Sequence, residues 1–212
     1  MYTKPDLLSA ARALCTAFAN GSNTATLLSH FTRDPYPTAH EHGLKGLAPF
    51  LGRTFTGVDG VGRYFQLLSE YLDVEEMRFE DETLWVVDTE AMAVVVRGEA
   101  RFAAKGTGDG IGHGERQAWE ERFVYRLGMA VDVHDDDDGG GGGGSLPLGS
   151  GGALKVQEYL VWADTGAAYL ALKKRLGEVQ GPETETRRSM DRKRSGCAGV
   201  IGSGMNAYGS CG

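Results

Sequence analysis

Polar and apolar residues alternate with a period of two through the middle of the chain, a pattern typical of β-strands that bury one face. In residues 116–127, one set of alternate positions is largely aromatic or apolar and the other is largely charged. The first set comprises Gln117, Trp119, Glu121, Phe123, Tyr125 and Leu127. Glu121 therefore shares a face with aromatic side chains, where a carboxylate either has a partner inside a core or points into a cavity.

The same period predicts further strands in residues 74–80, 84–87, 92–103 and 154–164. The strand over residues 92–103 has one apolar face and one largely charged face, so we expect it to be half buried. Alternation through the last strand predicts a common face made of Leu154, Val156, Glu158, Leu160, Trp162 and Asp164.

Apolar residues at helical spacing predict helices over residues 6–18, 59–72 and 167–176, with a shorter helix over residues 27–31. Phe65 lies on the apolar stripe of the second of these helices. Because helices come first and a run of strands follows, the order predicts a segregated α+β fold rather than alternating strands and helices.

Residues 38–43 follow a proline-rich break and are predicted to form a short extended segment. This segment presents three consecutive ionisable side chains, His40, Glu41 and His42. They are explained either by a chemical role or by hydrogen bonds that hold the rim of a sheet together.

The apolar pattern ends near residue 176, which predicts one domain over residues 1–176 and a disordered tail over residues 177–212. Residues 105–115 and 132–152 are longer than ordinary strand connections and low in complexity, so we expect two surface loops. The second loop contains a run of aspartates followed by a run of glycines. It lacks the ligand spacing of a calcium loop, so we expect no metal site there.

The formal net charge of −7 argues against a nucleic-acid partner. No apolar run approaches the roughly 20 residues that span a membrane, and the amino terminus lacks the features of a signal peptide. We therefore expect a soluble, cytoplasmic protein with no membrane partner. The three cysteines, Cys15, Cys197 and Cys211, are odd in number and predict neither a disulfide framework nor a metal site.

Taken together, these features resemble the nuclear transport factor two-like superfamily, and within it the SnoaL-like branch as it occurs in fungal proteins. The resemblance covers roughly residues 6–176 apart from the two loops. It is carried by the two amino-terminal helices, His40-Glu41-His42-Gly43, Asp59-Gly60-Val61, the aromatic residues Trp119, Phe123 and Tyr125, and Trp162-Ala163-Asp164. The resemblance implies a cone-shaped, curled antiparallel sheet packed on the amino-terminal helices, with a mostly apolar pocket at its open end.

Members of this superfamily include polyketide cyclases, ketosteroid isomerases, scytalone dehydratase and non-catalytic binding proteins. SnoaL-like cyclases transfer protons with an acidic residue near the end of the last strand, and Asp164 stands at the similar place here. Ketosteroid isomerases carry a carboxylate base in the first extended segment, a position that Glu41 or a neighbouring histidine occupies in this chain. The resemblance thus implies a small apolar ligand and proton transfer by carboxylates.

We therefore expect an isomerase, cyclase or dehydratase that acts without a metal or organic cofactor on a polyketide- or terpenoid-like carbonyl compound. The expected catalytic residues are Asp164, Glu121 and His42. A carboxylate among aromatic rings loses hydration, which raises its pKa toward the range useful for proton transfer at neutral pH. The expected ligand-binding residues are Trp119, Phe123, Tyr125, Trp162, Glu41 and Phe65.

Simpler explanations compete with these roles. Asp164 also suits the cap of the final helix, and Glu121 also suits a pair with an arginine of a neighbouring strand. The protein-level alternative is a non-catalytic ligand carrier or a dimeric protein-interaction module. We expect a homodimer, because the outward side of residues 92–103 mixes apolar and charged groups that can pair with the same face of a second copy across a two-fold axis.

Overall fold

The computed structural model describes residues 2–105, 117–133 and 152–179. Met1–Arg175 form one compact unit and Leu176–Gly212 a second, and we describe each by itself. In the second unit, the described residues include one short 3₁₀ helix, η2 (Leu176–Glu178). Most of the two predicted loops and of the predicted tail falls outside the described residues.

Helices begin the first unit and also close it, as the apolar spacing predicts. They are α1 (Lys4–Ala19), α2 (Thr24–Ser29), α3 (Gly57–Tyr71), the 3₁₀ helix η1 (Glu82–Leu84) and α4 (Thr165–Leu172). Helix α1 starts earlier than expected, because Thr3 is its cap and Asp6 accepts hydrogen bonds from the Thr3 backbone N–H (2.8 Å) and hydroxyl (2.7 Å). Likewise, Thr56 rather than Asp59 precedes α3.

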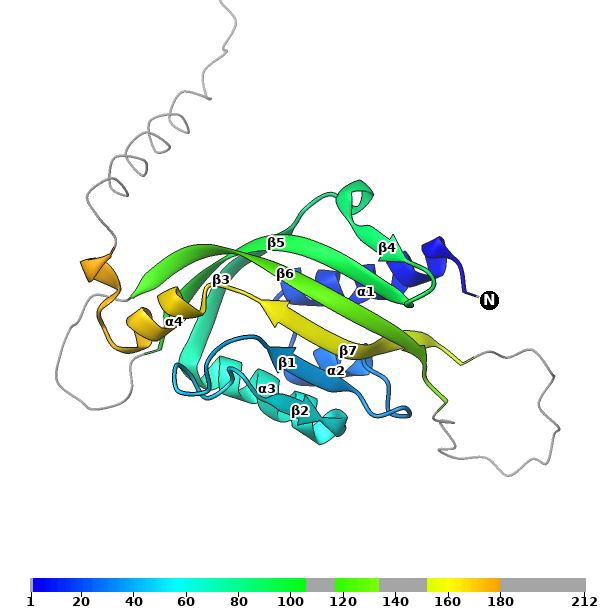
Figure 1. Ribbon diagram of the computed structural model, residues 1–212, viewed down its shortest axis with the longest axis horizontal. Coiled ribbons are helices and arrows are strands. Elements are labelled where there is room, and N and C mark those ends of the chain that lie inside the picture. Colours follow the sequence, from blue (N-terminus) through cyan, green and yellow to red (C-terminus); the bar gives the residue numbers. More distant parts are fainter. Residues whose placement is uncertain (1, 106–116, 134–151, 180–212) are drawn as a thin grey trace, which may run out of the picture. The chain divides into compact units, whose positions relative to one another are not determined.

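Among the described residues, seven strands form one curled sheet. They are β1 (Thr38–Glu41), β2 (Thr54–Thr56), β3 (Leu72–Phe79), β4 (Val86–Asp88), β5 (Ala93–Ala104), β6 (Ala118–Val131) and β7 (Leu154–Trp162). The order is β2-β1-β7-β6-β5-β3, and β4 also pairs with β5. Helix α1 contacts β3, β5, β6 and β7, whereas α3 contacts β1, β2 and β3. Figure 1 shows the long strands β5 and β6 bowing past these helices, which is the curled α+β arrangement predicted from the sequence.

One strand pair departs from the antiparallel sheet that we expected. Strand β1 runs parallel to β7, with Glu41 opposite Val161, so the sheet is mixed. Strands β2 to β6 lie between these two strands along the chain, so no hairpin sets their relative direction. Side chains alternate between the two faces of a strand whichever way the strand runs. The periodicity of the sequence therefore does not reveal whether β1 runs parallel or antiparallel to β7.

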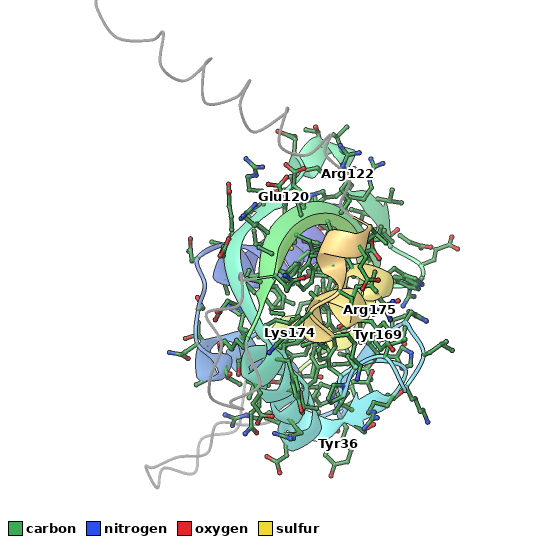
Figure 2. All side chains as sticks on the ribbon, turned by 90° about the vertical axis from the view of Figure 1, so that its left-hand side faces the viewer. Tyr36, Glu120, Arg122, Tyr169, Lys174 and Arg175 are labelled. Carbon is green, nitrogen blue, oxygen red and sulfur yellow. The ribbon has the colours of Figure 1, made fainter. Side chains whose placement is uncertain are left out.

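The alternation predicted for β6 is confirmed. Trp119, Phe123 and Tyr125 are buried on the inner face, whereas Glu120 and Arg122 are exposed. Figure 2 shows Glu120 and Arg122 pointing away from the curl of the sheet. The charged face of this strand is therefore the outer face, and the aromatic face looks toward the helices.

Glycine at position 98 lets the inner face of β5 approach an aromatic ring. Gly98 pairs with Phe123 across β5 and β6. A Cβ atom at Gly98 would lie 2.4 Å from Phe123 Cζ and 2.7 Å from the carbonyl oxygen of Arg78. Any larger residue there would have to displace the Phe123 ring, so this glycine determines where that ring lies.

The predicted common face of β7 is wrong beyond Val156. Gly128 pairs with Glu158, but Met129 pairs with Val156, so Gln157 is an extra residue in β7. Such a bulge shifts the alternation by one position. Tyr159 and Val161 consequently face inward.

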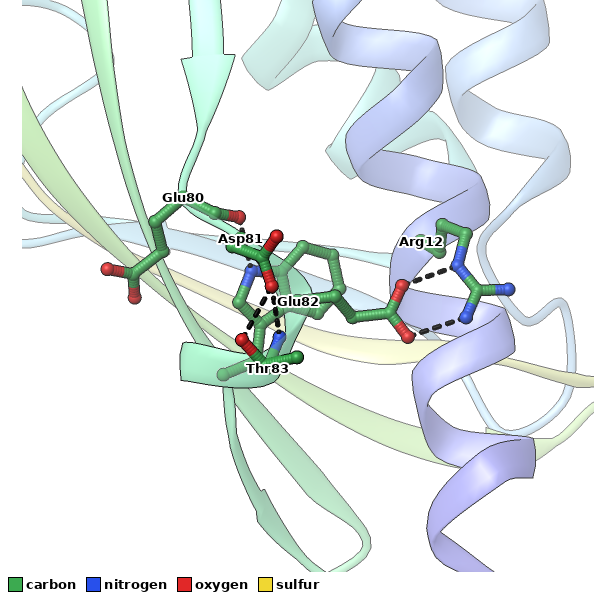
Figure 3. Close-up of polar contacts among 6 residues, drawn as sticks. Arg12, Glu80, Asp81, Glu82 and Thr83 are labelled. Carbon is green, nitrogen blue, oxygen red and sulfur yellow. Dashed lines mark hydrogen bonds and ion pairs between the residues drawn. The ribbon is translucent and has the colours of Figure 1, made fainter.

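The connection between β3 and β4 is tied to α1 by an ion pair (Figure 3). Arg12 of α1 donates to both carboxylate oxygens of Glu82, from Nε at 2.6 Å and from Nη2 at 2.5 Å. Asp81 accepts from the backbone N–H of Thr83 at 2.9 Å and so begins η1. Because η1 occupies these positions, β4 starts two residues later than the strand predicted over residues 84–87.

Candidate functional site

A cavity of about 430 Å³ lies between the inner face of the sheet and the helices. This volume falls within the range of roughly 300–1,000 Å³ found for small-molecule sites. Aromatic rings make up much of its wall, namely Phe18, Phe50, Tyr64, Phe65, Phe102, Trp119, Phe123, Tyr125 and Tyr159. The cavity is therefore suited to an apolar molecule.

A smaller hollow of about 240 Å³ lies among charged residues of β3, β5 and β6. Its side chains include Arg78, Glu99 and Arg101, which are engaged in ion pairs. Arg78 Nη2 lies 3.0 Å from Glu99 Oε1, and Arg101 Nε lies 2.6 Å from Glu75 Oε2. We take the larger aromatic cavity as the candidate site because its polar groups are few and convergent.

Glu41 is the most deeply buried carboxylate of the cavity wall. It ends β1, is 6% exposed, and its Oε2 accepts a hydrogen bond from the Tyr64 hydroxyl at 2.7 Å. Its other carboxylate oxygen has no hydrogen-bond partner among the described residues. No fully buried side-chain oxygen or nitrogen there lacks a partner, so this second oxygen faces the cavity. Burial raises the pKa of Glu41 to about 7, opposed by the Tyr64 hydrogen bond and reinforced by the charge of Glu121.

Glu121 is the second inward carboxylate and comes from the middle of the aromatic face of β6. Its Oε2 accepts a hydrogen bond from the Trp119 indole Nε1 at 2.7 Å. Burial raises the pKa of Glu121 to about 7, opposed by hydrogen bonds from Trp119 and from the Asp164 backbone and reinforced by the charge of Asp164. Within the described residues Glu121 forms no ion pair, so the arginine partner considered for it is not observed there.

Asp164 lies where β7 gives way to α4, and it lines the same cavity. Its Oδ1 accepts a hydrogen bond from the backbone N–H of Ala167 at 3.0 Å, which makes it the cap of α4 as the sequence predicts. Since Ala163 and Ala168 also line the cavity, the capped end of α4 forms part of its wall.

Four of the expected ligand-binding aromatic residues line the cavity, namely Phe65, Trp119, Phe123 and Tyr125. The rings of Phe123 and Tyr125 stack with centroids 4.4 Å apart, and Tyr125 meets Tyr159 at 4.9 Å in a T-shaped contact. Burial raises the pKa of Tyr125 and of Tyr159, so both phenols are neutral hydrogen-bonding groups at physiological pH.

His42 and Trp162 are not part of this cavity, contrary to the sequence-based expectation. The His42 ring stacks on Trp162 with centroids 4.3 Å apart, and Trp162 is 41% exposed. His40 belongs to the same cluster, with its ring 4.7 Å from that of His42. Alternation explains both positions: His42 follows the inward Glu41, and Trp162 follows the inward Val161 after the bulge.

Tyr64 and Tyr159 are among the cavity residues that the sequence does not indicate as site residues. Tyr64 is visible there only as one member of an apolar helix stripe, and nothing in the spacing connects it to Glu41. Tyr159 falls on the wrong face of the predicted strand because a single-residue bulge leaves no mark in the alternation. Both depend on contacts between elements distant in the chain.

The described residues contain no group of three or more histidine, cysteine, aspartate or glutamate side chains arranged to hold a metal ion. Among the described residues, no helix has the length and the apolar composition needed to span a bilayer.

No known family profile and no curated protein matches this sequence. Its fold, however, is similar to that of solved proteins. The pinacolase BvnE from Penicillium brevicompactum matches 84% of this chain and 100% of its own, with a TM-score of 0.52 and 11% identity. A Bacillus subtilis protein provisionally called an isomerase matches 82% of this chain and 97% of its own, with a TM-score of 0.54 and 6% identity.

A ketosteroid isomerase-like protein from Erwinia carotovora atroseptica matches 77% of this chain and 98% of its own, with a TM-score of 0.46 and 13% identity. At such identities a likeness concerns the fold alone. The predicted α+β fold, a curled sheet packed on helices, is confirmed.

Proposed function

We propose that this protein is an isomerase or cyclase that moves protons on a small, largely apolar carbonyl compound without a cofactor. The observation that carries the proposal is a pair of inward carboxyl groups, Glu41 and Glu121, in one aromatic cavity, each with its pKa raised to about 7. A group with a pKa near the working pH both takes and gives a proton efficiently.

Glu41 is assigned the role of base. Its oxygen facing the cavity takes a proton from the carbon next to the ligand carbonyl, so a C–H bond breaks and an O–H bond forms. Protonated Glu121 donates to the carbonyl oxygen, which becomes an enol. Burial is the main factor that favours the protonated form of Glu121 and so suits it to the role of donor. The like charge of Asp164 adds to this effect, whereas hydrogen bonds from Trp119 and from the Asp164 backbone oppose it.

The second half of the reaction determines its class. Return of the proton from Glu41 to another carbon gives an isomerisation, whereas attack of the enol carbon on a second carbonyl closes a ring. In the ring closure, Glu41 gives its proton to the oxygen of the second carbonyl. In both sequences the enol hydroxyl returns its proton to Glu121, so electrons are conserved and both carboxyl groups regain their starting protonation states. Proton transfer alone therefore suffices, and the reaction needs no redox partner.

Two hydrogen bonds support this assignment by fixing the carboxyl groups. Tyr64 holds one oxygen of Glu41 and Trp119 holds one oxygen of Glu121, so each carboxyl group keeps a defined orientation toward the cavity. Other proteins of similar fold carry the names pinacolase and isomerase, which is compatible with rearrangement chemistry on this scaffold.

Enolisation can be tested before the natural substrate is known. A panel of small apolar ketones is incubated with the protein in D₂O, and exchange of the protons next to the carbonyl is followed by ¹H NMR. We expect protein-dependent exchange with at least one ketone, and a loss of about 10²- to 10⁴-fold in Glu41→Gln and Glu121→Gln.

Glu120→Gln is the matched control, because Glu120 lies next to Glu121 on the exposed face of β6 and should leave exchange unchanged. Exchange that survives in both inner variants would overturn the assignment. Tight binding of a ketone without any exchange would favour the alternative of a non-catalytic ligand carrier.

A further inference from the structure

The charged side chains of the cavity wall all have one sign. Glu41, Asp73, Glu121 and Asp164 line it, and no lysine, arginine or histidine does so among the residues described. Asp73 is paired with Lys105, whose Nζ lies 3.2 Å from Asp73 Oδ1 and donates to the carbonyl oxygen of Ser69 at 2.5 Å. The other three acids form no ion pair in the described part of the chain.

The rest of the wall also favours positive charge. Nine aromatic rings line the cavity, and the negative face of an aromatic ring attracts cations. Glu41, which is 6% exposed, adds a carboxylate oxygen that has no hydrogen-bond partner among the described residues. An apolar cation bound here would meet aromatic rings around its body and carboxyl groups near its charge.

From this juxtaposition we infer that the cavity recognises an organic cation, a substituted ammonium group carried on an apolar body. The inference rests on the proposed function, because it uses the same cavity and adds an ammonium group to the carbonyl compound proposed as the substrate. An anionic ligand would meet only like charge, whereas an ammonium group would supply a countercharge to whichever of the three acids are ionised.

The direction in which binding affinity changes with pH distinguishes a cationic ligand from a neutral carbonyl ligand. The titratable groups that line the cavity are Glu41 of β1, Tyr64 of α3, Asp73 of β3, Glu121 and Tyr125 of β6, Tyr159 of β7, and Asp164 just before α4. Only Glu41 and Glu121 have a pKa raised to about 7. A cation binds best when they are ionised, whereas a carbonyl acceptor binds best when they are protonated.

Isothermal titration calorimetry with three probes of similar shape tests the inference. The probes are benzyltrimethylammonium, its neutral carbon isostere neopentylbenzene, and the anion phenylacetate. We expect the cation to bind at least about tenfold more tightly than the isostere at pH 8, and the anion not to bind. We also expect the affinity for the cation to rise about tenfold from pH 6 to pH 8, following the ionised fraction of one carboxyl group.

Substitutions of the two inner carboxylates test where the cation binds. Glu41→Gln and Glu121→Gln should each weaken binding of benzyltrimethylammonium at pH 8 by tenfold or more, while Glu120→Gln on the exposed face should bind as the parent does. Equal affinity for the cation and the isostere, or a flat or falling pH profile for the cation, would overturn the inference. Either result comes from the parent protein, so it stands even where a variant fails to fold, and neither affects the exchange test of the proposed function.

Discussion

Tyr64 donates its hydroxyl hydrogen to Oε2 of Glu41 across 2.7 Å, and this bond joins α3 to β1 at the cavity wall. Both residues are almost completely buried. The bond stabilises the ionised form of Glu41 and opposes the effect of burial on its pKa. The protonation state of Glu41 therefore depends on a helix that lies outside its own sheet.

Replacing Tyr64 by Phe should raise the pKa of Glu41 above about 7, because the change removes the donor and keeps the ring. A hydrogen bond to a charged group is worth roughly 1.5–3 kcal/mol, so we expect a rise of about one to two pH units. Titration of the side-chain carboxyl carbons by ¹³C NMR measures it. Tyr169→Phe, on α4 and outside the cavity wall, is the control, and an unchanged Glu41 titration in Tyr64→Phe would contradict the geometry.

Stability should fall as pH rises through the range in which the two inner carboxyl groups ionise. Glu41 and Glu121 bind protons more tightly in the folded protein, with a pKa of about 7 against 4.5 in the unfolded chain. Their contribution to the free energy of unfolding is thus fully present below about pH 4.5 and is lost as pH rises through about 7. Each of the two carboxyl groups accounts for a loss of unfolding free energy on the order of 3 kcal/mol.

Urea unfolding between pH 5 and pH 8 measures this loss, and the double variant Glu41→Gln/Glu121→Gln provides the comparison. We expect the unfolding free energy of the parent to decline over this interval and that of the double variant to decline much less. A parent that becomes more stable from pH 5 to pH 8 would contradict the raised pKa values.

Substitution of Asp164 separates its capping role from its charge. Asp164→Asn keeps an oxygen for the Ala167 backbone N–H, so the melting temperature should change little, whereas Asp164→Ala should lose about 1 kcal/mol of stability. Both changes remove a like charge and should lower the pKa of Glu121. A loss of turnover by orders of magnitude in Asp164→Asn, with an unchanged melting temperature, would instead identify Asp164 as the proton-transfer residue.

Gly98→Ala should destabilise the protein by about 1–3 kcal/mol, because the added methyl carbon would lie 2.4 Å from Phe123 Cζ. Thermal unfolding followed by circular dichroism measures the effect. Gly46→Ala is the matched control, since a Cβ there has no neighbour within 4 Å. Equal melting temperatures for the two variants would show that the Phe123 ring moves aside at little cost.

Association through the outer face of the sheet is a further prediction. The charged groups there already pair within one chain, as Arg97 does with Glu80 at 2.9 Å, so a second copy would meet balanced charge around apolar positions such as Val95. Sedimentation at micromolar concentration should give the mass of a homodimer, and Val95→Arg should give a folded monomer. A parent protein that sediments only as a monomer would remove this idea.

Much of the fold is readable in the sequence because its elements are long and strongly periodic. The helical stripe of α1 and the alternation of β5 and β6 recur in the structure within a few residues of the predicted bounds. Glu121 was also recognisable as an inward carboxylate. The residues on either side of it in β6 alternate between the two faces of the strand, and this alternation places Glu121 on the aromatic face. These features depend only on residues close together in the chain.

What the sequence by itself determined is the set of elements and, for β6, the side chains that face the core. The tertiary structure decided which polar groups meet. The parallel pairing of β1 with β7 brings Glu41 to the cavity, and α3 supplies Tyr64 to it. The Gln157 bulge turns Trp162 outward, where it meets His42 instead of a ligand. Local periodicity carries no information on strand direction, bulges or contacts between distant elements, because these are determined by packing of the whole unit.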